Sequence, residues 1–287
     1  MPQPKIILPV PRARISLTFL LACLMTFLMS SILFAQPTEN LELARRAATA
    51  EPPEGQSASN LKVSVGAGIM TAPEFEGAKK NELKALPVVE LSYDRVFFSL
   101  SKGLGVRIID NEAWTISPSL RYWAGRDEDA SDRLRGLGDV DAALALGGMI
   151  SYHPGDLSLF LNGYHGLGSE EGFTVELGAA LSRQLMEKLN FTAELSTLFA
   201  DEDYNQKFFG VTRQQAARSG YDFYQADAGF KHVALGGTLS YNLTQSINLG
   251  LFGEYKRLTG PAADSPIVER GSKNQVSSGL MIGFNLK

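Results

Sequence analysis

The chain of 287 residues has one cysteine, three histidines and no long hydrophobic run after Ala35. Cys23 lies in the N-terminal apolar segment, so the remainder of the chain can form neither a disulfide bond nor a thiolate zinc site. A membrane-spanning helix needs about 18 or more consecutive apolar residues, and no stretch after Ala35 approaches that length. These absences exclude a disulfide-stabilised fold and a bundle of transmembrane helices.

The N-terminus has the pattern of an export signal. Three basic residues precede an apolar run from Ile15 to Phe34, and Ala35 is a small residue at a suitable cleavage point. We expect residues 1–35 to be a signal peptide cleaved near Ala35. Because the run is long, an uncleaved anchor is an alternative, and Leu20–Cys23 also imitates a lipoprotein cleavage box.

Removal of residues 1–35 lowers the formal net charge from −4 to about −7, because the segment contains three basic and no acidic side chains. An acidic chain without basic clusters argues against a nucleic-acid partner. Residues 36–60 are rich in Pro, Glu, Ala and Ser, and their low apolar content predicts a flexible periplasmic leader, with one helical turn around Leu41 to Ala47.

From Leu61 the pattern changes to a period of two, which indicates β-strands with one apolar face and one small or polar face. In the segment from Phe173 to Leu181, for example, Leu177 lies on the apolar face and Glu176 on the other. The same alternation recurs to the C-terminus, and tight turns such as 153–156 and 242–245 alternate with long polar loops at 125–139, 201–227 and 259–274. Short turns at one end and long loops at the other are typical of an all-β, transmembrane antiparallel β-barrel over residues 61–287.

The number of strands follows from parity. Both ends of such a barrel should be periplasmic, which requires an even number of strands. If residues 97–109 form one strand the count is eleven, whereas a break at Lys102-Gly103 gives twelve and returns all long loops to one side. We expect twelve strands, with ten as the alternative.

The alternative fold is a soluble lipocalin-like or sandwich domain, in which the apolar face points inward. The export signal argues against it, and so does the end of the chain. The segment from Ser277 to Phe284 resembles the polar-x-Gly-x-x-apolar-x-aromatic signal of barrel precursors, although three residues follow Phe284. We therefore expect the protein in the cell outer membrane, in contact with lipid and lipopolysaccharide.

Motifs of common catalytic sites are missing. There is no Gly-x-Ser-x-Gly elbow, His-Glu-x-x-His helix, phosphate-binding glycine loop or Cys/His metal spacing. His153 falls in a tight turn, so only His165 and His232 could lie near the outer rim, where a catalytic base would be needed. We expect no enzyme activity, no cofactor and no metal ion.

The long loops contain most of the ionisable groups. The loop at 125–139 mixes both signs at close spacing, and its candidate functional residues are Asp127, Glu128, Asp129, Arg133, Arg135 and Asp139. A solvated loop with internal salt bridges is one interpretation. The functional interpretation is a contact with divalent cations or lipopolysaccharide, or a lid over the barrel.

In the loop at 201–227, Thr212 and Gln215 have the spacing of a capping box and Gly220 that of a C-cap, which predicts a two-turn helix. The pair Phe208 and Phe209 precedes it and is expected either to form an exposed docking surface or to close the barrel mouth. The remaining candidates for partner or rim contacts are Arg213, Arg218, Asp264 and Arg270.

Several segments together resemble the MipA/OmpV family of outer-membrane proteins. They are Gly125–Asp129 with Arg133–Val140, Phe209–Val211 with Gln215–Gly220, and Arg257-Leu258 with Ala262–Val268 and Gly271-Ser272, preceded by Leu86-Pro87. The resemblance implies an outer-membrane barrel that, in the family's namesake, scaffolds a murein lytic transglycosylase and a murein synthase. Other members resemble osmoregulated porins or adhesins.

Two functions therefore remain open. A scaffold would carry its binding determinants on the periplasmic turns and the leader at residues 36–60. A small-solute pore would need an open polar lumen, and the alternation predicts six inward ionisable residues: Lys62, Lys84, Glu90, Arg121, Glu176 and Glu194. Twelve strands can enclose either a narrow channel or an interior filled by side chains.

Overall fold

The computed structural model describes residues 43, 45–47, 61–168 and 172–286. The expected signal peptide at residues 1–35, its cleavage near Ala35 and most of the expected leader at residues 36–60 lie outside the described residues.

The described chain is mainly β-structure, with short helices between some strands. The strands are β1 (Leu61–Pro73), β2 (Asn81–Tyr93), β3 (Val96–Ser99), β4 (Gly103–Val106), β5 (Ile109–Asp110), β6 (Trp114–Trp123), β7 (Ala143–Tyr152), β8 (Leu157–Gly166), β9 (Phe173–Met186), β10 (Leu189–Ala200), β11 (Gly229–Asn242), β12 (Ile247–Leu258) and β13 (Asn274–Leu286). The helices are the 3₁₀ turn η1 (Glu128–Ala130), α3 (Glu202–Phe209), α4 (Arg213–Ser219), α5 (Gly260–Ala263) and α6 (Pro266–Glu269).

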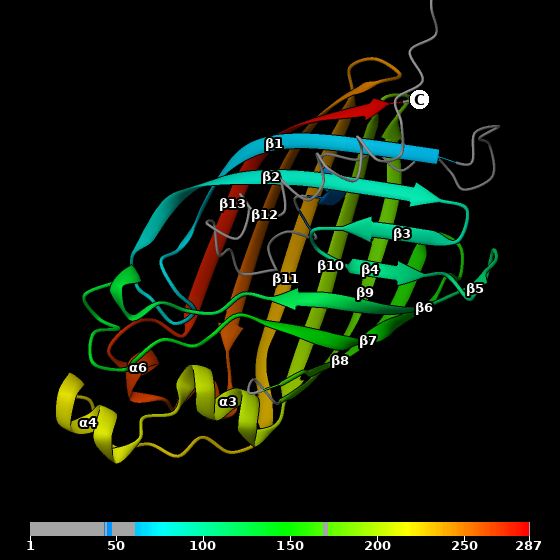
Figure 1. Cartoon of the computed structure of the whole chain (residues 1–287). Coiled ribbons are helices and arrows are strands. Elements are labelled where there is room, and N and C mark those ends of the chain that lie inside the picture. The colour runs from blue at the N-terminus through cyan, green and yellow to red at the C-terminus, as the bar shows by residue number, and fades with distance from the viewer. Residues whose placement is uncertain (1–42, 44, 48–60, 169–171, 287) are drawn as a thin grey trace, which may run out of the picture. The chain divides into compact units, whose positions relative to one another are not determined.

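The strands close into one antiparallel barrel (Figure 1). Strands that are consecutive in the chain pair with each other up to β4, and from β6 to β13; β1 pairs with β13, and β4 pairs with β6. β5 has only two residues and lies beside β6, so it continues β4 after an interruption and adds no strand to the wall. Within residues 61–286 the wall therefore has twelve strands, which confirms twelve over ten.

The break predicted at Lys102-Gly103 is confirmed as the turn between β3 and β4. Gly103 has φ +78°, and a Cβ there would lie 2.1 Å from the carbonyl oxygen of Leu120 on β6, so only glycine fits. Pro118 on β6 lies opposite the interruption between β4 and β5, where its missing N–H leaves the ladder incomplete.

The hairpin of β3 and β4 is much shorter than its neighbours (Figure 1). β2 pairs with β3 only over residues 90–93, so in the described part of the chain the edge of β2 at 81–89 has no strand on that side. Pro87 lies in this unpaired half, where an edge tolerates a residue without an N–H group.

The predicted alternation of faces is confirmed. On β6, Trp114 and Tyr122 are exposed on the outer surface, whereas Ser117 and Ser119 are buried on the inner surface. On β9, Leu177 is 45% exposed. Glu176 points the other way and accepts a hydrogen bond from Asn162 Nδ2 at 3.0 Å. An exposed apolar band with polar groups inside is what a barrel surrounded by lipid requires.

Exposed aromatic residues gather at two levels of the outer surface. Those at the short-turn end are Tyr93, Trp114, Tyr152, Tyr241 and Phe284, and those on the strands at the long-loop end are Tyr122, Phe173, Phe230 and Tyr255. Eight residue steps of about 3.4 Å separate the two levels on β6, and a strand tilt of about 40° reduces this length to roughly 21 Å. Two aromatic girdles at such a spacing match the apolar band of an outer-membrane barrel.

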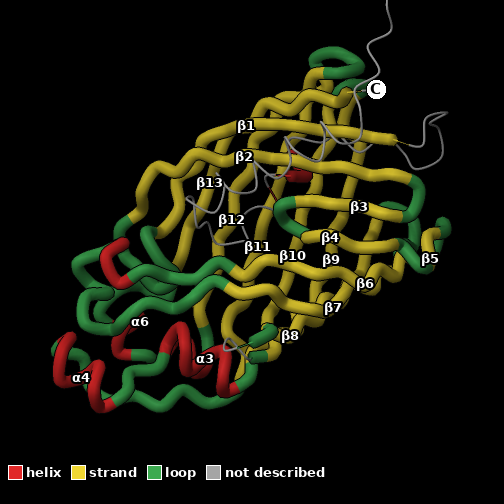
Figure 2. The backbone as a smooth tube through the Cα atoms, viewed as in Figure 1, coloured by secondary structure: helices red, strands yellow, loops and turns green. Residues whose placement is uncertain are grey.

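All helices of at least four residues in the range 61–286 lie at the long-loop end (Figure 2). The opposite end has short connections at 94–95, 111–113, 153–156, 187–188 and 243–246. Among the described residues, no helix combines the length and apolarity needed to cross a bilayer.

The assigned faces of β9 can be tested with two substitutions at adjacent positions. We expect Leu177→Arg to impair assembly, because an arginine facing lipid costs about 2–4 kcal/mol near the bilayer midplane. Glu176→Gln should assemble normally, because the amide can still pair with Asn162 inside the barrel. Heat-modifiability on gels measures the folded fraction, and equal fractions for the two variants would contradict the assignment.

Candidate functional site

Four loops at the long-loop end fold together into what we call the loop layer, namely residues 74–80, 124–142, 201–228 and 259–273. They share one hydrophobic core, formed by Phe75, Ala78, Leu134, Leu137, Val211, Tyr221 and Ile267. Because every loop contributes a buried side chain, the loop layer is packed like a small domain and is not a set of independent surface loops.

Local sequence signals explain the two helices of the longest loop. α4 has the predicted capping box between Thr212 and Gln215, and Gly220 ends it with φ +72°, so the predicted helix is confirmed. The sequence analysis missed α3. Its signal was Asp201, whose Oδ1 accepts a hydrogen bond from the N–H of Tyr204 at 3.0 Å and caps the helix.

Phe209 is only 1% exposed, so the expectation that both phenylalanines form an exposed docking surface is wrong. It ends α3 and packs against Leu258, Val268 and the alanines of α5. Phe208 is half-buried beside this cluster and stacks on Tyr204, with ring centroids 4.8 Å apart. Helix formation at 202–209 turns the pair toward the neighbouring loop, where burial of apolar area stabilises it.

Two acidic residues of the loop at 124–142, Glu128 and Asp139, serve the fold of that loop. Glu128 Oε2 accepts the N–H groups of Gly136 and Gly138 at 2.9 and 2.8 Å, and Asp139 Oδ1 accepts the N–H of Glu128 at 2.7 Å. Asp127 occupies the N-cap position of η1 without a side-chain capping bond, and Asp129 lies exposed in η1. Over the described ranges, no group of three or more acidic, histidine or cysteine residues is arranged to hold a metal ion.

Arginine side chains tie three loops of the layer together. Arg133 donates from Nη1 to the carbonyl oxygen of Arg270, and Arg270 donates from Nη2 to that of Gly220 at 2.7 Å. The guanidinium of Arg270 also lies 4.3 Å from the centre of the Tyr221 ring. Arg135 lies at the surface and pairs with Asp132 at 3.0 Å. Arg133 and Arg270 therefore have structural contacts that their spacing in sequence did not reveal.

The other candidates lie on the outer side of the loop layer. Arg213 is exposed over the ring of Phe223, at 4.8 Å from its centre, and Arg218 is exposed near the end of α4. Asp264 pairs with Lys273 at 3.6 Å, and both groups are partly exposed. The structure thus brings Arg133 and Arg270 together but leaves Arg213, Arg218 and Asp264 apart.

Arg126 is a structural residue of the layer that the sequence analysis did not single out. Its Nη1 donates to the carbonyl oxygen of Phe208 at 2.5 Å, which joins the loop at 124–142 to the end of α3. Burial lowers the pKa of the Arg126 guanidinium to about 10, because the charged form loses water contacts. The group is still charged at neutral pH. Its signal in the sequence was an arginine directly before the acidic run.

The six ionisable residues predicted to face inward are mostly engaged by other groups. Glu90 pairs with Arg45 at 2.9 Å, and Glu194 pairs with Arg46 at 3.2 Å. Their partners come from the segment before the barrel, which no feature of the strands predicted. Lys84 pairs with Glu82 at 3.0 Å, and Glu176 accepts a hydrogen bond from Asn162. The guanidinium of Arg121 lies 5.4 Å from the centre of the Tyr164 ring. Lys62 is exposed at the start of β1.

The two histidines considered as possible bases occupy different faces. His165 is exposed on the outer face of β8, with Leu159 and Leu161, and therefore does not face the lumen. His232 is buried at the long-loop end of β11, beside a bulge in the pairing with β10. His153 contacts Ser158 Oγ at 2.9 Å and Thr115 Oγ1 at 3.3 Å near the turn at 153–156. The residues His165 and His232 do not combine into one site.

A closed twelve-stranded antiparallel wall, an apolar outer band between aromatic girdles and long loops at one end define an outer-membrane β-barrel. The chain belongs to the family described as MltA-interacting protein MipA, which it matches over residues 65–285.

Two relatives from Escherichia coli strain K12 match most of the chain. The MltA-interacting protein is 26% identical over 233 residues, which cover 78% of this chain and 90% of that protein. YiaT, which is described as an outer membrane protein, is 25% identical over 235 residues, which cover 79% of this chain and 92% of the relative.

Solved porin structures are among the structural matches of the chain. The NanC porin has a TM-score of 0.40 at 10% identity and covers 79% of this chain and 100% of its own. The KdgM porin has a TM-score of 0.39 at 7% identity, and the match covers 78% of this chain and 99% of the porin chain. At these scores neither likeness bears on solute transport by this chain.

The packing of the loop layer can be tested at Phe209. We expect Phe209→Ala to leave the barrel assembled but to destabilise the loop layer by about 3–5 kcal/mol, because it opens a cavity beside α5. Limited proteolysis of the folded protein would show faster cleavage within residues 201–228. The matched control is Phe223→Ala, since Phe223 is 50% exposed in the same loop. Equal cleavage of both variants would contradict a packed layer.

Proposed function

We propose that the protein is a non-enzymatic scaffold of the outer membrane that binds a murein lytic transglycosylase and a murein synthase at its periplasmic end. Membership of the MltA-interacting protein family carries this proposal. The short-turn end of the barrel holds the chain's C-terminus and is the end that faces the periplasm in such barrels, where murein lies.

The short turns offer apolar side chains suited to a protein interface. Met186 at the end of β9 is 69% exposed, and Leu243 in the turn after β11 is 47% exposed. The two turns are joined, because the N–H of Asn242 donates to the carbonyl oxygen of Lys188 at 2.8 Å. Interfaces typically depend on a few apolar side chains at their centre, and Met186 and Leu243 are our candidates.

The alternative function, a small-solute porin, osmoregulated channel or adhesin, has weaker support. Arg45 and Arg46 occupy the space in which an open channel would run, and the loop layer has its own core. The exposed Arg213 and Arg218 of the loop layer would suit a contact with lipopolysaccharide phosphates, as part of the anchoring of a scaffold in the membrane.

The partner site can be tested by direct binding to a purified lytic transglycosylase of the MltA type. We expect Met186→Asp combined with Leu243→Asp to weaken binding at least about tenfold, which corresponds to about 1.4 kcal/mol. Biolayer interferometry with the intact barrel in detergent measures the affinity. Phe223→Asp, at the opposite end, is the matched control and should bind like the intact protein. Unchanged affinity of the double variant would reject this surface, and no binding by the intact protein would reject the scaffold.

We also propose that residues 1–35 are removed on export, so that the mature chain begins near Gln36. The expected result of N-terminal sequencing of protein extracted from outer membranes is therefore a start close to Gln36. Detection of Lys5 in that material would show that the segment is retained as an anchor.

A further inference from the structure

A short helical turn formed by Leu43 and Arg45–Ala47 lies in contact with the inner wall of the barrel (Figure 2). Leu43 and Ala47 are four residues apart, so they share one face of the turn. They are 3% and 0% exposed. A single turn is not stable in water by itself, so its surroundings in the lumen must stabilise the helical conformation.

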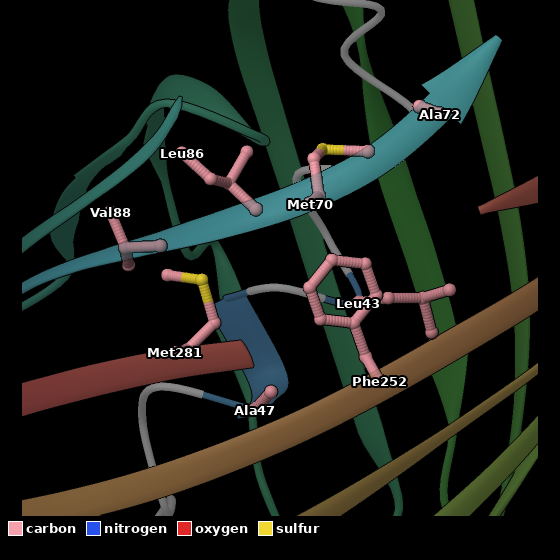
Figure 3. Packing of buried hydrophobic residues seen from close by; sticks show 8 residues of the cluster. All are labelled: Leu43, Ala47, Met70, Ala72, Leu86, Val88, Phe252 and Met281. Atoms are coloured by element: carbon pink, nitrogen blue, oxygen red, sulfur yellow. The ribbon is translucent and has the colours of Figure 1, made fainter. Parts of the chain in front are cut away.

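The apolar face of the turn lies on β11 and β12 at two glycines. A Cβ at Gly250 would lie 2.2 Å from the carbonyl oxygen of Ala47, and a Cβ at Gly236 would lie 2.9 Å from Leu43 Cδ1. Phe252, Met281 and Met70 complete the apolar surroundings of the turn (Figure 3). Close approach of the backbone at Gly250 shows that the wall and the turn fit each other without room for a side chain.

Two ion pairs attach the turn to nearly opposite walls. Arg45 pairs with Glu90 on β2, and Arg46 pairs with Glu194 on β10. In the closed sheet these strands are five steps apart in one direction and seven in the other. Neighbouring residues of a helix point about 100° apart, so two consecutive arginines can reach two different walls.

Arg45 and the end of the turn are buried, and Arg46 is partly buried. The side chain of Arg45 is 5% exposed and that of its partner Glu90 is 24% exposed. In the second pair Arg46 is 25% exposed and Glu194 is 13% exposed. Ser240 Oγ donates to the carbonyl oxygens of Ala47 at 2.8 Å and Arg46 at 3.2 Å, which satisfies acceptors that the end of a helix leaves free. Removal of one partner of a buried ion pair leaves an uncompensated charge, so both pairs hold the turn firmly.

We infer that the turn is an internal plug that keeps a narrow transmembrane channel closed. Glu90 and Glu194 form the binding site for its two arginines, and Gly236 with Gly250 forms the seat for its apolar face. Withdrawal of the plug leaves a lumen lined with serine, threonine, lysine and carboxylate groups beside the apolar residues that surround the turn, with enough strands for a narrow path. This role goes beyond the proposed scaffold and does not depend on it.

Planar-bilayer conductance of the full chain tests closure. Arg45→Glu combined with Arg46→Glu places like charges against Glu90 and Glu194, and Gly250→Leu fills the seat. We expect each variant to raise the open probability at least about tenfold, which requires only about 1.4 kcal/mol. The matched control is Gly253→Leu on the same strand, since Gly253 faces outward with its nearest neighbour at 3.9 Å. If heat-modifiability shows that both variants are folded and neither of them conducts, the plug is overturned.

Cross-linking tests the position of the turn separately. In a Cys23→Ala background, Ala47→Cys with Ser240→Cys should form a disulfide in isolated outer membranes, because Ser240 contacts the backbone of Ala47. Ala47→Cys with Ser117→Cys is the control, since Ser117 lies on β6, five strands from β11. Equal cross-linking in both pairs, or none with Ser240→Cys, would overturn the assigned seat.

The same conductance variants should bind the lytic transglycosylase like the intact protein, because their substitutions lie inside the barrel. Normal binding with silent channels would overturn the plug and leave the scaffold intact. Conducting variants of a protein that does not bind the enzyme would support the plug and reject the scaffold.

Discussion

The pairing of β4 with β6 is the contact on which the rest of the structure depends, because it closes the sheet. In a bilayer backbone N–H and C=O groups must be bonded within the protein, so the sheet has to close on itself. The half of β2 at 81–89 is a part of the wall that this closure leaves without a neighbouring strand. The pairing of β4 with β6 involves only two positions and its continuation through β5 adds two more, whereas β1 and β13 pair over nine positions. Gly103 and Pro118 lie at this short seam, which makes it the least redundant part of the wall.

Closure also explains how the lumen is filled. The alternation of residues that supplies an apolar band outside necessarily turns carboxylates such as Glu90 and Glu194 inward. These groups cannot move to the lipid side, and their burial is costly without a partner. The arginines of the helical turn supply that partner, so the chain itself neutralises the charges that its barrel creates.

The loop layer follows the rules of a water-soluble domain. Phe209, Leu134 and Ile267 are buried, and polar side chains such as Glu128 and Arg126 bind backbone groups of the loops. Segments that resemble the family most clearly therefore maintain the packing of the layer. This leaves the opposite end, which we propose faces the periplasm, as the surface for the proposed partners.

The sequence by itself determined the barrel. Alternation with a period of two is a local property, so it assigned Leu177 to the outer face and Glu176 to the inner face correctly, and parity placed the break at Lys102-Gly103. The capping box of Thr212 and Gln215 is equally local and correctly predicted α4. The same alternation placed Glu90 and Glu194 inside the barrel, but it did not predict that Arg45 and Arg46 pair with them.

Only the tertiary structure decided which distant segments meet. The burial of Phe209 depends on α5 and α6, the contact of Arg133 with Arg270 joins loops far apart in the chain, and Arg46 meets Glu194 only because the wall closes around it. Such contacts leave no periodic signal, since either residue alone is compatible with a solvated loop or leader. Closure of the sheet brings these segments together, and the shape of the enclosed space selects which of them pair.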